Sequence, residues 1–374
     1  SPYNGDFIKR HAEAAGLYDE VQVIYVGRDT EGRFTKDVLA EEFVQGQLTE
    51  KIIYYYSPKR AITLFDKIAS ERKYRRIYKQ AVQDYINKNG KPAIVHVHVG
   101  MKAGVIALWI KRNFAVPYVV SEHWSGFLEE AKERFNDLSV YLKQQWKRVL
   151  RNASGSAVVS KYLADSIQKI FPWINPVIIP NVVNTAVFYP QPNVSDHQQF
   201  IHISGLDDLK NPKEMLQAFK IVSEKYPGIR LEIVGSRRRE IVEFARDLGL
   251  SDKVSFHDEV PQPVLARHIN QSLALILYSS YETFGCVVIE ANACAVPVIV
   301  SDIPVFHETV KGSFNGVFAK PHDPSALAEK MMELIKNRSS FDSHAISTMT
   351  GSTYDYQTVG KLFSDWYKAI LKDA

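Results

Sequence analysis

Residues 281–290 read Tyr-Glu-Thr-Phe-Gly-Cys-Val-Val-Ile-Glu and come shortly after the apolar run Leu273–Leu277. This order predicts a buried strand, a loop and then a helix that starts directly after Gly285. The helix would point its free N–H groups and the positive end of its dipole at an anion such as a diphosphate. Glu282 and Glu290 would flank that anion, where carboxylates accept hydrogen bonds from sugar and ribose hydroxyls.

A purely structural interpretation of the two carboxylates also fits the spacing. Glu282 could cap the helix, and Glu290 could be a solvated or ion-paired helix residue. The spacing alone does not separate the two interpretations.

Short β-branched segments alternate with amphipathic patterns on both sides of this stretch. Such alternation is typical of βαβ units with parallel sheets. It breaks at residues 180–197, where Pro180, Pro190 and Pro192 predict an interdomain linker. We therefore predict two doubly wound α/β domains, residues 1–187 and 188–353, with the ligand in the cleft between them.

The expected strands are Val21–Val26, Ile52–Tyr56, Ala93–Val99, Tyr118–Ser121, Ala157–Val159, Phe200–Ser204, Leu231–Val234, Val254–Phe256, Leu273–Leu277, Val298–Val300 and Val317–Phe318. The expected helices are 60–88, 102–113, 128–152, 212–226, 237–249, 261–271, 286–294, 324–337 and the amphipathic tail from Tyr354. The helix at 128–152 is predicted because apolar residues recur there at spacings of three and four.

The composition excludes several classes of protein. The 374 residues are 45% hydrophobic and 24% charged, as in ordinary globular proteins. No run approaches the roughly 20 apolar residues that span a bilayer. Two cysteines, Cys286 and Cys294, exclude a disulfide scaffold and fit a reducing compartment. We expect a cytoplasmic protein.

Charge is distributed unevenly between the halves. Residues up to Val187 carry 27 Lys and Arg against 19 Asp and Glu (net +8), and the remainder carries 19 against 23 (net −4). This surplus could bring the first half to the inner face of an anionic membrane with a lipid-linked acceptor, or it could be an ordinary solvated surface. We expect no nucleic-acid partner. The basic residues are the run 72–79 with Lys143, Lys147, Arg148 and Arg151.

Signatures of several cofactors and metals are absent from the sequence. There is no GxGxxG, GxxxxGK[ST], GxSxG or HExxH motif. His96 and His98 alternate with valine and share one sheet face, yet the sequence offers no evident third ligand. We therefore predict no metal and no cofactor.

Six segments, in order along the chain, together resemble the family 4 glycosyltransferases, which are retaining enzymes. The resemblance implies the GT-B fold, in which two Rossmann-like domains face each other across a cleft. The segments are 5–11 (Gly loop and first helix), 121–124 (strand-end histidine), 179–188 (hinge), 206–211 (lysine loop), 233–236 (strand and Gly turn) and 281–290 (Glu-x7-Glu).

The resemblance assigns a role to each matched residue. It implies three catalytic residues, with His123 bonding a sugar hydroxyl, Lys210 contacting the donor diphosphate and Glu282 holding hydroxyls of the transferred sugar. Glu290 would hold the ribose, and backbone N–H groups around Gly285 would meet the phosphates. The implied donor-binding residues are Gly5, Gly205, Lys210, Gly235, Arg237, Glu282, Phe284, Gly285, Cys286 and Glu290.

One position departs from the family pattern. The family usually has an arginine immediately before the leucine of the lysine loop, and this chain has Gly205. One of two expected cations on the diphosphate is therefore missing there. Arg237, Arg238 or Arg239 could replace it, or this triplet could be a solvated helix start.

The fold that the family implies also makes two predictions about the ends of the chain. Its first strand should precede the loop Tyr3–Phe7, where only two residues stand, so we expect that strand to be missing from this sequence. The tail helix, residues 354–374, should pack back on the first domain.

The resemblance implies a metal-independent, retaining transfer of a hexose from a UDP- or GDP-sugar to an acceptor hydroxyl of a glycan or lipid-linked molecule. Bacterial polysaccharide or glycan assembly is the expected setting. Two alternatives stay open. One is a sugar-nucleotide 2-epimerase of the same architecture, and the other is a two-domain sugar-binding protein similar to periplasmic receptors.

Overall fold

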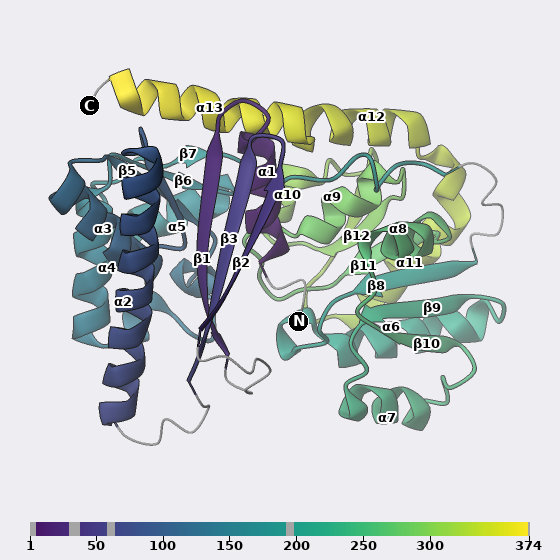
Figure 1. Ribbon diagram of the computed structural model, residues 1–374. Coiled ribbons are helices and arrows are strands. Elements are labelled where there is room, and N and C mark those ends of the chain that lie inside the picture. Colours follow the sequence, from purple (N-terminus) through teal and green to yellow (C-terminus); the bar gives the residue numbers. More distant parts are fainter. Residues whose placement is uncertain (1–4, 30–37, 58–63, 192–197, 373–374) are drawn as a thin grey trace.

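The computed structural model describes residues 5–29, 38–57, 64–191 and 198–372 and shows two α/β halves side by side (Figure 1). Two consecutive C-terminal helices run along one side, residues 343–354 over the second half and residues 356–372 over the first. The predicted linker is described over 180–191, where it has no regular structure, and its residues 192–197 lie outside the described residues.

The strands of the first half form two separate sheets within the described ranges. Three strands form one sheet in the order β1–β3–β2, and four parallel strands form the other in the order β4–β5–β6–β7. The elements are α1 (Asp6–Ala15), β1 (Val21–Asp29), β2 (Val38–Gln45), β3 (Leu48–Tyr56), α2 (Leu64–Asn89), β4 (Val95–His98), α3 (Ala103–Phe114), β5 (Tyr118–Glu122), α4 (Val140–Asn152), β6 (Gly155–Val158), α5 (Lys161–Ile170) and β7 (Val177–Ile178).

Two details of the first half differ from the sequence prediction. Strand β2 was not predicted, and it pairs with β3 in the antiparallel sense although the sequence predicted parallel sheets. The chain turns between the two strands in two residues, with Gly46 at φ +59°, and so short a connection allows only antiparallel pairing. The helix predicted at 128–152 begins only at Val140, because the Ser139 side chain accepts the N–H of Leu142 and caps it there. The apolar residue Phe135 lies before it, in a short 3₁₀ turn.

The second half is one parallel sheet in the order β10–β9–β8–β11–β12–β13. This order reverses between β8 and β11, so the loops that follow these two strands meet at the switch point of the sheet. The elements are β8 (Gln199–Ile203), α6 (Pro212–Lys225), β9 (Arg230–Gly235), α7 (Arg239–Asp247), β10 (Val254–Asp258), α8 (Gln262–Asn270), β11 (Ala274–Leu277), α9 (Cys286–Ala293), β12 (Val298–Ser301), α10 (Phe306–Thr309), β13 (Gly316–Ala319), α11 (Pro324–Asn337) and α12 (Ser343–Tyr354).

The last helix, α13 (Tyr356–Lys372), returns to the first half and packs along α1. The two helices approach closely at Gly360, where an added Cβ would lie 2.1 Å from the carbonyl oxygen of Ala14. The Tyr356 hydroxyl donates to Glu13 at 2.7 Å, and the Tyr367 hydroxyl lies 2.6 Å from the His96 ring. Because α12, which packs on α9 of the second half, leads directly into α13, these two helices link the halves.

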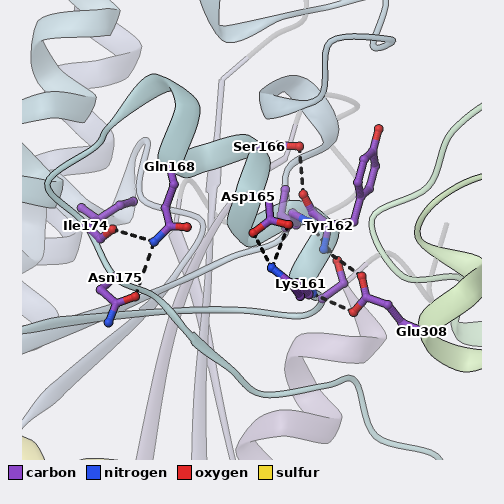
Figure 2. Close-up of polar contacts among 10 residues, drawn as sticks. Lys161, Tyr162, Asp165, Ser166, Gln168, Ile174, Asn175 and Glu308 are labelled. Carbon is purple, nitrogen blue, oxygen red and sulfur yellow. Dashed lines mark hydrogen bonds and ion pairs between the residues drawn. The ribbon is translucent and has the colours of Figure 1, made fainter.

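A second contact between the halves joins α10 to the start of α5 (Figure 2). Both carboxylate oxygens of Glu308 accept backbone N–H groups, at 2.7 Å from Lys161 and 2.7 Å from Tyr162. These N–H groups belong to the first turn of α5, which has no partner for them within the helix. Glu308 thus caps a helix of the opposite half and joins the two halves at this point.

Candidate active site

A cavity of about 450 Å³ lies between the two halves, at the switch point of the second sheet. Its size is in the range of small-molecule sites. The first half contributes α1 and the end of β5, and the second half contributes the loops after β8 and β11 with the start of α9. The residues lining it that the sequence singled out are His123, Gly205, Lys210, Gly235, Glu282, Phe284, Gly285, Cys286 and Glu290.

The first turn of α9 forms one wall of this cavity. Gly285 precedes the helix at φ +86°, in the left-handed region, and an added Cβ would lie 2.8 Å from the Phe306 ring. Only glycine meets both demands without strain. Burial raises the pKa of the Cys286 thiol to about 12, so this residue stays a thiol at neutral pH. The helix therefore offers N–H groups and no anionic sulfur at its start.

Lys210 and Glu282 form an ion pair from the two loops at the switch point. Their side chains are 17% and 13% exposed, and the Ser279 hydroxyl donates a second hydrogen bond to Glu282 at 2.8 Å. Burial lowers the pKa of Lys210, but the attraction of Glu282 outweighs it and raises this pKa above its usual value. The ammonium therefore stays charged in the cavity.

Glu290 is fully enclosed one turn into α9 and pairs with Arg10 of α1, at 2.7 Å between Oε1 and Nη1. Burial raises the pKa of Glu290, and the Arg10 guanidinium opposes that rise. Arg10 also donates to Asp6 at 2.8 Å, and the Gln262 amide from the opposite half donates to Asp6 at 2.7 Å. The two halves are joined here by charged groups that line the cavity.

His123 lies at the end of β5 beside Phe7 of α1, with 4.8 Å between ring centres. Burial lowers its pKa well below the usual value, so the imidazole is neutral and can bond a hydroxyl. Its Nε2 lies 3.1 Å from Nδ1 of His98, a hydrogen-bond distance. Burial also lowers the pKa of His11, the neighbouring ring, to about 4.

The structure brings together a histidine cluster that the sequence did not reveal. His11, His98 and His123 offer ring nitrogens within 4.8 Å of one another. The facing nitrogens of His98 and His123 already share a hydrogen bond, with ring planes 19° apart. An ion could bind only by replacing this hydrogen bond, so the cluster gives no support for a metal site. That the protein uses no metal ion stays a prediction.

Three expected donor residues are placed less directly. Gly235 lines the cavity at φ +123°, where a Cβ would lie 2.6 Å from the Ser204 carbonyl oxygen. Gly5 begins α1 at φ +86° but does not line the cavity itself. Arg237 is 59% exposed, pairs with Asp258 at 3.2 Å and is also outside the lining. Arg238 donates to the Leu206 carbonyl oxygen at 2.7 Å and Arg239 is 91% exposed, so none of the three arginines after Gly235 lines the cavity.

Sequence reasoning missed Arg10 and Asp6, although both fall in the segment 5–11. They stand four residues apart, so they share a face of α1, but this spacing is common in solvated helices. Arg10 looks no different in the sequence from its exposed neighbour Lys9. No local signal marks it as a cavity residue.

Known proteins of this fold are similar to the whole chain. Sucrose-phosphate synthase of Thermosynechococcus elongatus superposes with a TM-score of 0.78 at 18% identity, covering 99% of this chain and 94% of the other. Anabaena HepE, solved with UDP and glucose, superposes with a TM-score of 0.73 at 15% identity, covering 99% and 97%. At such identities the likeness shows the fold, which is GT-B.

Sequence comparison places the chain in a family. A profile described as Glycosyltransferase Family 4 matches residues 10–187, and the adjoining profile, Glycosyl transferases group 1, matches residues 188–347. The chain belongs to the family 4 glycosyltransferases.

Two curated relatives illustrate how distant the individual matches are. A D-inositol 3-phosphate glycosyltransferase of Thermobispora bispora is 23% identical over 275 residues, covering 66% of this chain and 63% of that protein. A glycogen synthase of Mycobacterium tuberculosis is 23% identical over 300 residues, covering 76% and 71%. The chain thus spans less than two thirds of the first of these relatives.

Proposed function

We propose that this chain is a retaining glycosyltransferase that moves a hexose from a nucleotide diphosphate sugar to an acceptor hydroxyl. One observation carries the proposal: the interdomain cavity holds a partly buried lysine, a helix N-terminus and two carboxylates. The lysine and the helix suit a diphosphate, and the carboxylates suit hydroxyls. Residues 188–353 would hold the nucleotide, and residues 1–187 the acceptor.

The chemistry rests on stabilising the leaving diphosphate. Lys210 and the N–H groups at the start of α9 would face the charge that develops as the sugar departs. Lys210 and Glu282 are partners in the structure, and a donor would engage both, its phosphate the ammonium and its sugar hydroxyl the carboxylate. The neutral ring of His123 would bond a further hydroxyl. Retention of configuration is implied by the family.

The donor is proposed to be a UDP- or GDP-sugar. Anabaena HepE was solved with UDP and glucose, and the pneumococcal O-GlcNAc transferase GtfA with UDP and GlcNAc, which favours UDP. A thermal-shift panel of UDP, GDP, ADP and their sugars tests this choice, because a ligand bound only by the folded state raises the unfolding temperature. No shift with any nucleoside diphosphate would contradict the proposal.

Transfer without a metal is tested by assaying glycosyl transfer with and without a chelator. The family resemblance implies that Lys210 and α9 supply the positive charge that a metal would otherwise provide. Activity that survives exhaustive chelation agrees with this role. Activity that disappears and returns with a divalent cation contradicts it.

The two alternatives make different predictions about products and ligands. An epimerase would convert the donor sugar without any acceptor, so donor and enzyme are incubated alone and examined for a new epimer. A sugar-binding protein would prefer free sugar, whereas a cavity with Lys210 prefers the nucleoside diphosphate, and calorimetry with each separates them.

The acceptor is proposed to be a glycan or a lipid-linked molecule in bacterial polysaccharide or glycan assembly. Within the described residues no helix is both long and apolar enough to cross a membrane. Tyr74 and Tyr78 of α2 pack against the core of the first half, while Arg72 and Arg76 of the same helix are exposed. Cosedimentation with anionic and neutral vesicles tests whether this basic surface binds a membrane.

A further inference from the structure

Two basic side chains line the cavity within the described residues, Lys210 and Arg10. The cation that the family resemblance implies at position 205 is absent. A Cβ added at Gly205 would meet nothing within 4 Å, so the wall is open there. The cavity therefore lacks a cation at position 205, where the family pattern expects one. It contains Arg10, at a position where the family pattern does not call for a cation.

Arg10 reaches the same part of the cavity as Lys210. Arg10 pairs with Glu290 of α9, Lys210 pairs with Glu282 in the loop before this helix, and both cations line the cavity together with Gly285 and Cys286 at the helix start. The N–H groups that should face a diphosphate belong to this first turn. The two positive charges therefore enter the cavity that holds this first turn from opposite sides, Lys210 from the second half and Arg10 from the first.

The Arg10 side chain is 9% exposed and held in one orientation by four contacts. Nε and Nη2 lie 2.8 and 2.7 Å from Oδ2 of Asp6, and Nη1 lies 2.7 Å from Glu290 and 3.2 Å from the Val182 carbonyl oxygen. A guanidinium is planar and has five N–H groups, so these four contacts fix its plane and leave one N–H, on Nη2, for a further acceptor. Such preorganisation reduces the entropy lost when a ligand binds.

We propose that Arg10 is the second cation of the diphosphate site, supplied by the first domain in place of the arginine that Gly205 removes. This inference rests on the proposed function. Because Arg10 and Lys210 come from opposite halves, the site is complete only when the halves are in contact as they are here. Arg10 also holds the Glu290 carboxylate beside it.

The test measures binding of uridine and of UDP to each variant by calorimetry and compares the Kd of uridine divided by the Kd of UDP. This ratio falls when a contact to the diphosphate is lost. The ratio isolates the diphosphate, because nucleoside contacts and the folded fraction affect both ligands alike. If the base is guanine, guanosine and GDP replace them. We expect Arg10→Met to lower the ratio about tenfold or more, as for a lost charge-assisted hydrogen bond.

Two further variants sharpen the test. Lys9→Ala removes a charge from the same helix at a side chain that is 50% exposed and outside the cavity, and it should leave the ratio unchanged. Arg10→Met combined with Gly205→Arg returns an arginine to the family position, where there is open space, and should restore most of the ratio. An unchanged ratio in Arg10→Met overturns the inference.

The failure of this inference is distinguishable from failure of the proposed function. If the wild-type chain binds no nucleoside diphosphate, the proposed function fails. If Lys210→Ala lowers the ratio and Arg10→Met does not, only the role of Arg10 fails. Should Arg10→Met not fold, Arg10→Gln decides: it keeps N–H donors for the neighbouring carboxylates but loses the charge, so a lowered ratio supports the inference and an unchanged one overturns it.

Discussion

Replacing Lys210 by methionine removes one positive charge from the cavity while keeping most of the side-chain volume. On the proposed function this contact is strongest in the transition state, when charge moves onto the diphosphate. Loss of one such contact lowers turnover by about 100-fold or more, which corresponds to roughly 2.7 kcal/mol. We expect Lys210→Met, Lys210→Ala and Glu282→Ala each to fall in this range.

The Lys210–Glu282 ion pair makes it possible to separate the effect of Lys210→Met on turnover from its effect on folding stability. Lys210→Met leaves Glu282 enclosed without its cation, at 13% exposure, although Ser279 still donates to it at 2.8 Å. An enclosed group that loses one partner costs on the order of 2 kcal/mol of unfolding free energy. The double variant Lys210→Met/Glu282→Gln removes both charges and should recover most of that stability.

Turnover is measured by release of nucleoside diphosphate at saturating donor, and stability by urea unfolding. The control is Lys213→Met, an exposed lysine of α6 outside the cavity, which should change neither quantity appreciably. The double variant should be stable and still about 100-fold slow. Turnover within threefold of wild type in Lys210→Met, or recovered turnover in the double variant, would refute the electrostatic role.

Three further predictions concern the scaffold. Gly285→Ala places a Cβ at φ +86° and 2.8 Å from the ring that begins α10, so we expect roughly 2–4 kcal/mol lower stability by urea unfolding and weaker nucleotide binding by calorimetry. Glu308→Ala removes the cap that the second half provides to α5, so we expect about 1–2 kcal/mol lower stability, and an unchanged unfolding midpoint would contradict the bridging role. Burial lowers the pKa of His11 and His202 to about 4 and that of His96 to about 3, so below pH 6.5 only the unfolded chain gains these protons. Urea unfolding at pH 7 and pH 5 should show stability falling by roughly 2 kcal/mol for each of the three, with His98 and His123, whose pKa burial also lowers, acting in the same direction. The pKa of Glu122, raised to about 8, opposes this by about as much as one histidine, and equal stability at the two pH values would refute the net sign.

The parts of the site that the sequence could predict are those set by local spacing. Glu282, Gly285 and Glu290 lie in one ten-residue stretch, so strand, loop and helix start fix their relation to each other. Lys210 follows β8 in the same way that Glu282 follows β11. Because β8 and β11 are neighbours in a parallel sheet, their loops must meet, which agrees with the doubly wound topology expected from the sequence.

The parts that the sequence could not predict depend on contacts between distant segments. Arg10 and Glu290 are 280 residues apart, and nothing in either segment records the other. β2 was not predicted because almost all its side chains are exposed, so it lacks the alternation that marks a half-buried strand. The stretch before α4 shows the opposite failure, since apolar residues such as Phe135 recur at helical spacing without forming a helix.

The charges of the cavity connect its two halves to the proposed reaction. Enclosed carboxylates are costly unless they are paired, and here Glu282 is paired with Lys210, while Glu290 and Asp6 share Arg10. A diphosphate would add negative charge to this group, so it can bind only where both cations are already in place and partly desolvated. Since Arg10 comes from the opposite domain, separating the halves would remove half of that positive charge. On the proposed function, donor binding and contact between the domains are therefore one equilibrium, and the sugar is activated only inside a cavity that both domains enclose.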